Sequence, residues 1–105
     1  MVIRSWEGTA RTGAGNEYLV YLTEVVIPEI RAIPGCLGVR VMRGVRHPDR
    51  FVVQTHWSDV ESVMRFAGPD PDLAVVPPEA RALLADFEDR ARHFDVVVDH
   101  FPGAS

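Results

Sequence analysis

Residues 51–61 read FVVQTHWSDVE, and this stretch joins an apolar strand to the start of a helix. Phe, Val, Thr and Trp favour strands. The strand period of two sends Val53, Thr55 and Trp57 to one face of a sheet and the residues between them to the other. The serine that follows, with a glutamate three residues later, matches the capping-box pattern. We therefore expect a strand to end at Trp57 and a helix to begin at about Asp59.

The chain of 105 residues has the length of one folded domain, residues 1–105, with 102–105 as a short tail. It is 47% apolar and 25% charged, the balance of an ordinary globular protein. The net charge of −4, with acidic and basic residues interspersed, disfavours a nucleic-acid partner. A single cysteine, Cys36, excludes an internal disulfide, and no Cys or His pair has the spacing of a structural zinc site.

Membrane segments are not expected from this sequence. No apolar run approaches the ~20 residues that a membrane span needs. The first residues lack the basic and then apolar layout of a signal peptide. We therefore expect no membrane partner and a location in the cytoplasm.

Hydrophobic spacing predicts a single α+β domain. The expected strands are residues 2–10, 36–43, 51–57 and 92–101. A first helix is expected between Glu17 and Pro34, with a bend or restart at Pro28. A second helix begins at 59 and a short third one at Pro77; their buried residues are expected to be Val60, Val63, Met64 and Ala67 in the second, and Leu83, Leu84 and Phe87 in the third. This order predicts one antiparallel sheet with its helices on one face.

The second face of that sheet has no helix to cover it. Val96–Val98 and Phe51–Val53 are apolar on both sides of their strands, whereas a solvated face calls for polar alternation. An identical sheet from a second copy is the simplest cover. We expect a homodimer through the sheet face.

The pattern resembles the antibiotic biosynthesis monooxygenase family. The resemblance covers nearly the whole chain and rests on five segments: Arg4–Gly8, Tyr18–Leu22, Pro34-Gly35, His56–Asp59 with Val63–Gly68, and His93–Val96. It implies a ferredoxin-like, four-stranded antiparallel sheet with helices on one face, closing into a dimeric α/β barrel. Family activities include oxygenation of polycyclic phenols and quinols without metal or flavin, haem degradation and signalling-molecule turnover.

Haem degradation is the activity that this sequence fits worst. Haem-degrading relatives use an Asn on the first strand, a Trp at the end of the third and an iron-binding His on a later helix. Trp57 matches the Trp, but Glu7 stands near the Asn position and residues 77–87 contain no His. Ferric haem needs a protein ligand that this helix does not supply. We therefore expect no cofactor and no metal.

Aromatic residues are the candidate lining of a substrate pocket between sheet and helices. Trp6, Trp57 and Tyr21 could stack on a flat aromatic substrate. Core packing is the alternative for each of them. Arg4, a charge among apolar neighbours, needs either an anionic group of the substrate or a salt bridge. The sequence offers Glu7, Glu17 or Asp95 as its partner.

His93 is the candidate general base, because an imidazole titrates near neutrality and oxygenation of a phenol begins with loss of a proton. The alternative is a hydrogen-bonding residue at a strand entrance. His56 points opposite to Trp57, towards the expected dimer interface. The sequence thus predicts a cofactor-independent monooxygenase acting on an aromatic phenol or quinol. A non-catalytic small-molecule-binding or structural domain of the same fold is the alternative.

Overall fold

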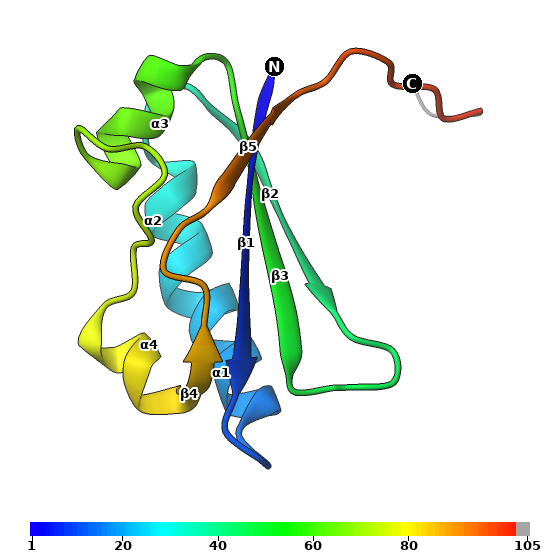
Figure 1. Cartoon of the computed structure of the whole chain (residues 1–105), viewed down its shortest axis with the longest axis vertical. Helices are drawn as coiled ribbons and strands as arrows, with labels where there is room; N and C mark the ends of the chain where they lie inside the picture. Colours follow the sequence, from blue (N-terminus) through cyan, green and yellow to red (C-terminus); the bar gives the residue numbers. More distant parts are fainter. Residues whose placement is uncertain (103–105) are drawn as a thin grey trace.

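The computed structural model describes residues 1–102 and has one antiparallel sheet with helices on a single face (Figure 1). The order across the sheet is β2-β3-β1-β4, and β5 also pairs with β1. The strands are β1 (Val2–Ala10), β2 (Cys36–Arg43), β3 (Arg50–Trp57), β4 (Leu84–Phe87) and β5 (Arg92–Asp95). β4 pairs with the C-terminal end of β1 and β5 with its N-terminal half, so five strands fill four positions. The predicted α+β, ferredoxin-like fold is confirmed.

The first helical segment contains a widened turn. It runs through α1 (Gly15–Tyr21), the π-helical η1 (Leu22–Val26) and α2 (Ile27–Arg31). The amide of Ile27 bonds to the carbonyl of Leu22, five residues back. Pro28 follows directly, and because proline has no N–H and its ring crowds the carbonyl four residues back, the wider turn relieves that clash. The predicted restart at Pro28 is therefore present as a π turn.

The helix after β3 begins one residue later than predicted. α3 spans Val60–Ala67, and Asp59, not Ser58, is its N-cap: the Asp59 carboxylate accepts from the amide of Ser62 at 2.8 Å. Ser62 and Val63 are buried on this helix. Val60 and Met64 are 45% and 39% exposed, so their predicted burial is wrong. The side of α3 that is buried is therefore the one that carries Ser62 and Val63.

The short predicted helix is α4 (Pro78–Leu83), and it ends earlier than the apolar pattern indicates. Leu84 and Phe87, predicted on its apolar side, belong instead to β4. Leu84 is buried and pairs with Ala10 of β1. The sequence missed this strand because four residues are too short for a strand period to stand out against a helical one.

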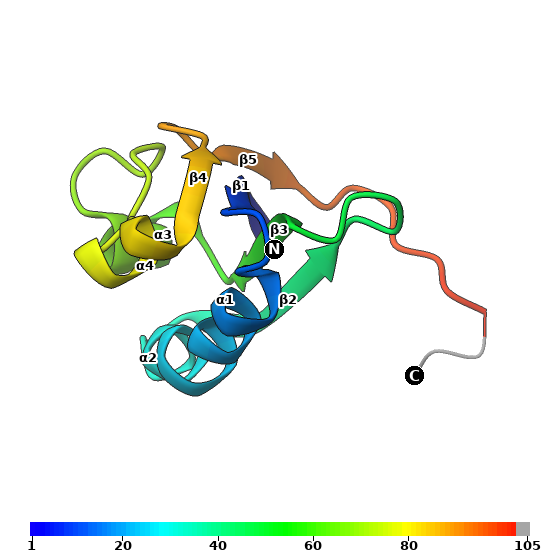
Figure 2. The same ribbon diagram turned by 90° about the horizontal axis from the view of Figure 1, so that it is seen from below.

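The face of the sheet under the helices carries the core. Along β1 every second residue from Val2 to Ala10 is buried. One core cluster includes Trp6, Tyr18 and Phe51, and a second includes Trp57 and Val63. Figure 2 shows the helices gathered on this side of the sheet.

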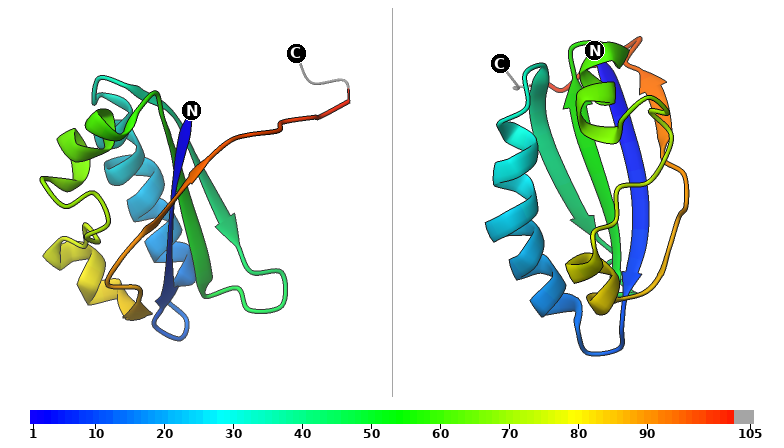
Figure 3. Two further views of the ribbon diagram at one scale, coloured as in Figure 1. Left: turned by 45° about the horizontal axis from the view of Figure 1, so that its top comes forward. Right: turned by 90° about the vertical axis from the view of Figure 1, so that its left-hand side faces the viewer.

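The opposite face carries no helix in the part of the chain that the structure describes (Figure 3). Cross-strand pairing places Ile3 between His56 and Phe94 on this face. Phe94 is 54% exposed. Glu7 and Gln54 lie on the same face, so it is mixed in character and less apolar than the sequence predicted.

The predicted strand 92–101 is correct for its first four residues only. Beyond Asp95 the chain leaves the sheet (Figure 1), with Val97 88% and Val98 82% exposed. Of the predicted tail, residues 103–105 lie outside the described residues. None of the helices in residues 1–102 has the length and apolarity that crossing a membrane requires.

Candidate active site

A cavity of about 170 Å³ lies between the sheet and the helices. Its floor is the helix-facing side of β1 and β3: Arg4, Trp6, Val53 and Thr55. One wall comes from the first helical segment, with Tyr18, Tyr21, Leu22, Val26, Glu29 and Ile30. The facing wall comes from α3, α4 and the loop between them, with Phe66, Val75, Val76, Pro77 and Ala80. The lining is mostly apolar, as in small-molecule sites.

Trp6 lines the cavity with its ring and turns its polar edge away. Its indole N–H donates to the carbonyl of Glu88 at 2.8 Å. The ring lies over Gly8, where a Cβ atom would come within 2.7 Å of it. The absence of a side chain at Gly8 therefore leaves room for the indole ring of Trp6 on the floor.

Trp57 lies outside the lining of the cavity. It is fully buried and stacks on Phe66 with ring centroids 5.9 Å apart. Its indole N–H donates to Thr55 Oγ1 at 2.8 Å. Because Phe66 and Thr55 do line the cavity, Trp57 supports two lining residues from behind.

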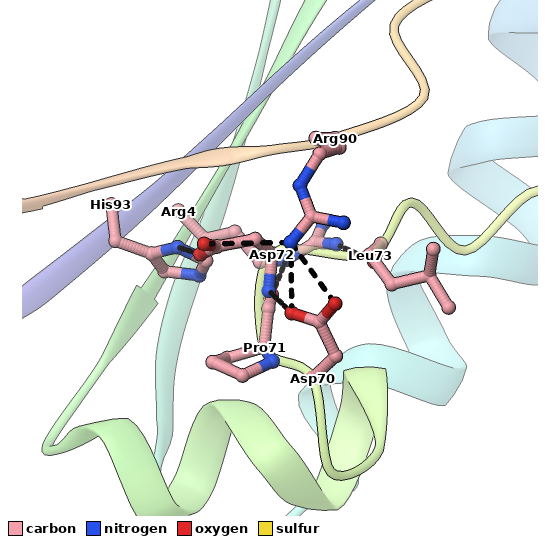
Figure 4. Close-up of polar contacts among 7 residues, drawn as sticks. All are labelled: Arg4, Asp70, Pro71, Asp72, Leu73, Arg90 and His93. Carbon is pink, nitrogen blue, oxygen red and sulfur yellow. Dashed lines mark hydrogen bonds and ion pairs between the residues drawn. The ribbon is translucent and has the colours of Figure 1, made fainter.

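Arg4 is a nearly buried cation on the floor, 5% exposed. Nη2 donates to the carbonyl of Leu73 at 2.7 Å, and Nε lies 3.4 Å from the carbonyl of Pro71 (Figure 4). The guanidinium also lies over the Phe66 ring, 5.2 Å from its centroid. Burial lowers the pKa of Arg4 to about 10, an effect that the charge of Asp72 opposes.

None of the three predicted salt-bridge partners pairs with Arg4 among residues 1–102. Glu7 points to the opposite face of the sheet, where it pairs with Arg50. The structure instead holds Arg4 through backbone carbonyls of the loop that follows α3. Carbonyl oxygens satisfy hydrogen bonds but bring no net negative charge, so the cation is left without a bonded counter-ion in the described chain.

His93 lies beside Arg4 but does not line the cavity. The two residues are directly opposite each other on β5 and β1. His93 Nδ1 is 2.8 Å from Asp72 Oδ1, and Arg90 reaches the same loop through Asp70 at 3.0 Å (Figure 4). His93 Nε2 is buried and has no hydrogen-bond partner within residues 1–102.

The two tyrosines of the first helix both reach the cavity, and both keep their protons at neutral pH. Burial, followed by the neighbouring Tyr21, raises the pKa of Tyr18 well above its usual range. Burial raises the pKa of Tyr21 as well, with further contributions from Glu79 and Glu29. Both side chains therefore act as hydroxyl groups and apolar walls rather than as phenolate bases.

The structure thus brings Arg4, Trp6 and Tyr21 of the sequence-predicted site together at one cavity, and it places Trp57 and His93 just behind the lining. Sequence reasoning missed Thr55 and Phe66. Thr55 was assigned to the correct face of β3, but a threonine in a strand carries no signal of function. Phe66 lies in the family-like segment of α3, where the pattern singled out Val63 and Met64 instead.

The groups that line the cavity offer little to a metal or to haem iron. No His, Cys or Met side chain is among its lining residues in the described chain. No three His, Cys, Asp or Glu side chains within residues 1–102 come close enough to hold a metal ion. Tyrosine can ligate haem iron only as phenolate, which the raised pKa of Tyr18 and Tyr21 disfavours.

Several solved structures share this fold. SnoaB, a cofactor-independent oxygenase from Streptomyces nogalater, superposes with a TM-score of 0.73 at 20% identity, over 93% of this chain and 94% of that chain. MhuD, a heme-degrader from Mycobacterium tuberculosis, gives 0.71 at 22% identity, over 96% and 100%. A Shewanella oneidensis protein gives 0.71 at 14% identity, over 89% and 87%. At such identities the likeness shows the fold alone.

The sequence itself matches one family model over more than half of its length. No curated protein matches it significantly. The model for antibiotic biosynthesis monooxygenases matches residues 1–70, which include β1, β3, the first helical segment and α3. These elements supply the floor of the cavity and most of its walls. The chain therefore belongs to the antibiotic biosynthesis monooxygenase family.

Proposed function

We propose that the protein is a cofactor-independent monooxygenase that oxidises a phenol- or quinol-type aromatic molecule in the cavity between sheet and helices. The observation that carries this proposal is the combination of an apolar, aromatic-walled cavity with a nearly buried cation, Arg4, on its floor. The family and the likeness to a cofactor-independent oxygenase support it. The apolar walls exclude water, and the cavity holds the substrate in one orientation.

The substrate supplies the electrons in this reaction. Its phenolate transfers one electron to O2, and combination of the two radicals forms a C–O bond at an unsubstituted ring carbon. Protonation gives a hydroperoxide, and loss of water leaves a carbonyl on that carbon. One oxygen atom of O2 ends in the quinone and the other in water, while the substrate loses two hydrogen atoms.

The proton of the substrate needs an acceptor. We retain His93 as the proposed base, because its Nε2 has no partner in the described chain and it stands beside Arg4. It acts only on a substrate that reaches past Arg4, since His93 does not line the cavity. Tyr21 is the weaker choice, because its raised pKa keeps its hydroxyl protonated.

We also propose that the protein is a homodimer, closed through the bare sheet face, and that it acts in the cytoplasm. His56 projects onto that face, and its Nε2 is buried without a partner in residues 1–102. The exposed Phe94 lies on the same face, opposite Ile3 of β1. A second copy supplies both apolar cover and hydrogen-bond partners.

The alternative function is non-catalytic binding of a small aromatic molecule. It is favoured by one specific observation: the lining holds no imidazole in the described chain, and its tyrosines remain protonated. Haem degradation stays disfavoured, because the lining offers no His, Cys or Met to iron in the described residues. The two remaining functions differ in whether oxygen enters the bound molecule.

Incorporation of an oxygen isotope distinguishes the monooxygenase from the non-catalytic binding protein. The purified protein is incubated under ¹⁸O2 with phenols that carry a free para position, such as 1-naphthol, and the product is analysed by mass spectrometry. A monooxygenase gives a quinone with one ¹⁸O atom, above the rate in Trp6→Ala and in protein-free samples. Binding without any labelled product, over the whole panel, supports the non-catalytic alternative. The exposed Val25→Ala serves as the matched control.

A further inference from the structure

The floor of the cavity carries two hydrogen-bond donors side by side. Arg4 on β1 and Thr55 on β3 are directly opposite each other in the antiparallel register. Directly opposite residues share one face of a sheet and stand within about 5.5 Å of each other at Cβ. Both line the cavity, and both are buried, at 5% and 2% exposure.

Arg4 keeps donor capacity after its contacts with the protein are counted. A guanidinium has five N–H groups. Within residues 1–102, the hydrogen bonds of Arg4 go to the carbonyls of Leu73 and Pro71 through Nη2 and Nε, and none is formed by Nη1. The guanidinium is therefore held on the loop side through Nη2 and Nε, while the N–H groups of Nη1 remain available to a ligand.

Thr55 is oriented by Trp57. The indole of Trp57 is a donor only, so Thr55 Oγ1 must be the acceptor in their 2.8 Å hydrogen bond. With that lone pair occupied, the hydroxyl is free to donate its own hydrogen, and no hydrogen bond from it to another group is present in the described chain. Trp57 is thus a positioning residue that makes Thr55 a donor at the cavity floor.

We propose that Arg4 and Thr55 form an oxyanion site, and that the ligand of this cavity is a one-ring or small aromatic molecule bound through an anionic oxygen, as a phenolate or a carboxylate. The inference rests on the proposed function for the cavity itself and deepens it by naming the ligand's charge. A charge-assisted hydrogen bond from a buried cation is far stronger to an anion than to a neutral oxygen.

The other charged groups near Arg4 do not neutralise it. Asp72, on the loop side, is bound by His93 at 2.8 Å and lies 3.8 Å from Arg90. Its side chain is half exposed, so its field at Arg4 is screened. Glu29 lines the cavity but is solvent-exposed on α2, at the rim. Asp72 therefore offsets the charge of Arg4 only in part and forms no ion pair with it. An anion on the floor meets the remaining positive charge, whereas a neutral ligand leaves Arg4 without a bonded counter-ion.

The size of the cavity limits the ligand. A cavity of roughly 150 Å³ in another protein is large enough for benzene, and this one measures about 170 Å³. One aromatic ring fits on the floor, and any further ring extends towards the mouth. p-Nitrophenol and benzoate are therefore suitable probes.

The first experiment follows the visible absorbance of p-nitrophenol, whose phenolate is yellow and whose phenol is not, during anaerobic titration with protein. We expect the bound probe to ionise at lower pH than the free probe, and p-nitrophenolate to bind about tenfold or more tightly than neutral p-nitroanisole. Arg4→Gln removes the preference, and the exposed Arg31→Gln leaves it unchanged. Equal binding of anion and neutral probe by the unmodified protein would overturn the proposal.

Thr55 and Trp57 give a test that does not depend on Arg4 and its loop. Thr55→Val keeps the strand-forming shape and removes the hydroxyl, so we expect several-fold weaker p-nitrophenolate binding and unchanged p-nitroanisole binding. Thr55→Ser restores the preference for the anion. Trp57→Phe lowers the preference part of the way, because the Thr55 hydroxyl is then free to turn. An unchanged titration curve for the bound probe in Thr55→Val would remove Thr55 from the site.

Benzoate with benzamide as its neutral counterpart separates the two sources of anion. Tighter binding of benzoate alone assigns the site to carboxylates, and tighter binding of p-nitrophenolate alone assigns it to phenolates. Because the titrations exclude oxygen, they test binding separately from catalysis. Anion binding that depends on Arg4, in a protein that shows no turnover, would support the oxyanion site and contradict the proposed oxygenase activity. Turnover that is unaffected by both Arg4→Gln and Thr55→Val would support the oxygenase activity and contradict the oxyanion site.

Discussion

Asp72 and His93 are joined by a 2.8 Å contact that ties the loop after α3 to the edge strand β5. The same loop is held from below by Arg4, which donates to the carbonyl of Leu73. The loop forms part of the cavity wall through Val75 and Val76. The position of this wall therefore depends on polar contacts with the two strands rather than on apolar packing alone.

Removing the Asp72 carboxylate should loosen this wall. Asp72→Ala leaves His93 Nδ1 without its partner, and we expect the free energy of unfolding to fall by about 1 kcal/mol. Amide hydrogen exchange of residues 70–77 should become faster while β1 and β3 are unaffected. Glu24→Gln, on the exposed side of the helix, is the control. Unchanged exchange in the loop would show that Asp72 does not hold it.

The corrected helix cap predicts an acid-sensitive contribution to stability. Hydrogen bonds from the Ser62 side chain and amide lower the pKa of Asp59 below its usual value. A carboxyl whose pKa is lower in the folded state stabilises the fold above its unfolded pKa, near 4, and loses this contribution as the pH falls through the folded value. Asp59→Ala should therefore melt earlier at pH 7, and its difference from the unmodified protein should shrink as the pH falls below the unfolded pKa.

The choice of cap residue can be checked with a neighbouring variant. Ser58→Ala should lower the melting temperature at pH 7 less than Asp59→Ala does, because Ser58 does not cap α3 and its side chain contacts Ser62 Oγ at 3.2 Å. A larger loss in Ser58→Ala than in Asp59→Ala would restore the capping box that the sequence predicted.

A methyl group at Gly8 should displace Trp6. An added Cβ would lie 2.7 Å from the indole ring, which is closer than atoms can pack. We expect Gly8→Ala to cost about 1–3 kcal/mol of stability and to shift the tryptophan fluorescence, because the ring must leave the cavity floor. Gly38→Ala is the control, since nothing lies within 4 Å of its Cβ position in the described chain. Equal losses in both variants would argue against this contact.

Replacing Arg4 by an apolar residue should separate binding from stability. Arg4→Met fills a similar volume and removes the buried charge, but it also leaves the carbonyls of Leu73 and Pro71 without their donor. We expect urea denaturation to show a free energy of unfolding that is lower by about 1–3 kcal/mol, while anion binding is lost completely. A loss of more than about 3 kcal/mol would mean that Arg4 serves mainly to hold the loop after α3.

The bare sheet face predicts a dimer that one charge can disrupt. Light scattering coupled to size-exclusion chromatography should give twice the mass of the chain. Phe94→Glu places a charge beside Ile3 on that face and should give a monomer that remains folded, because Phe94 is 54% exposed within one chain. Val25→Glu, on the helix side, should remain dimeric. A monomeric unmodified protein would contradict the predicted interface.

The sequence predicted β1, β2 and β3 well because these strands carry clear two-residue alternation, whereas it missed β4 and made β5 too long. In β1 and β3 the predicted faces agree with the structure, including Arg4 and Trp6 on the helix side. The helices were placed correctly, but their buried sides were predicted less well. On α3 the apolar spacing indicated Val60 and Met64 as buried, whereas the structure buries Ser62 and Val63, and a buried serine cannot be predicted from hydrophobic spacing.

The candidate site was predicted in part for the same reason. Arg4, Trp6 and Tyr21 line the cavity. Their position could be predicted because the strand and helix periods show on which side of β1 and of the first helical segment they lie. Trp57 was assigned to the correct face, yet whether a side chain on that face reaches the cavity depends on what covers it, here Phe66 of α3. The partners of Arg4 lie more than sixty residues away in the chain and are backbone carbonyls, which no pattern of side chains reveals.

The most direct test of the account is a two-dimensional ¹H–¹⁵N spectrum of the protein with added benzoate or p-nitrophenolate. The central claim is that the ligand binds on the floor formed by Arg4 and Thr55. It predicts shifts in the side-chain signals of Arg4 Nε and of the Trp57 indole N–H, together with the amides of β1 and β3 beneath the cavity. Shifts confined to the bare sheet face, around His56 and Phe94, would contradict it.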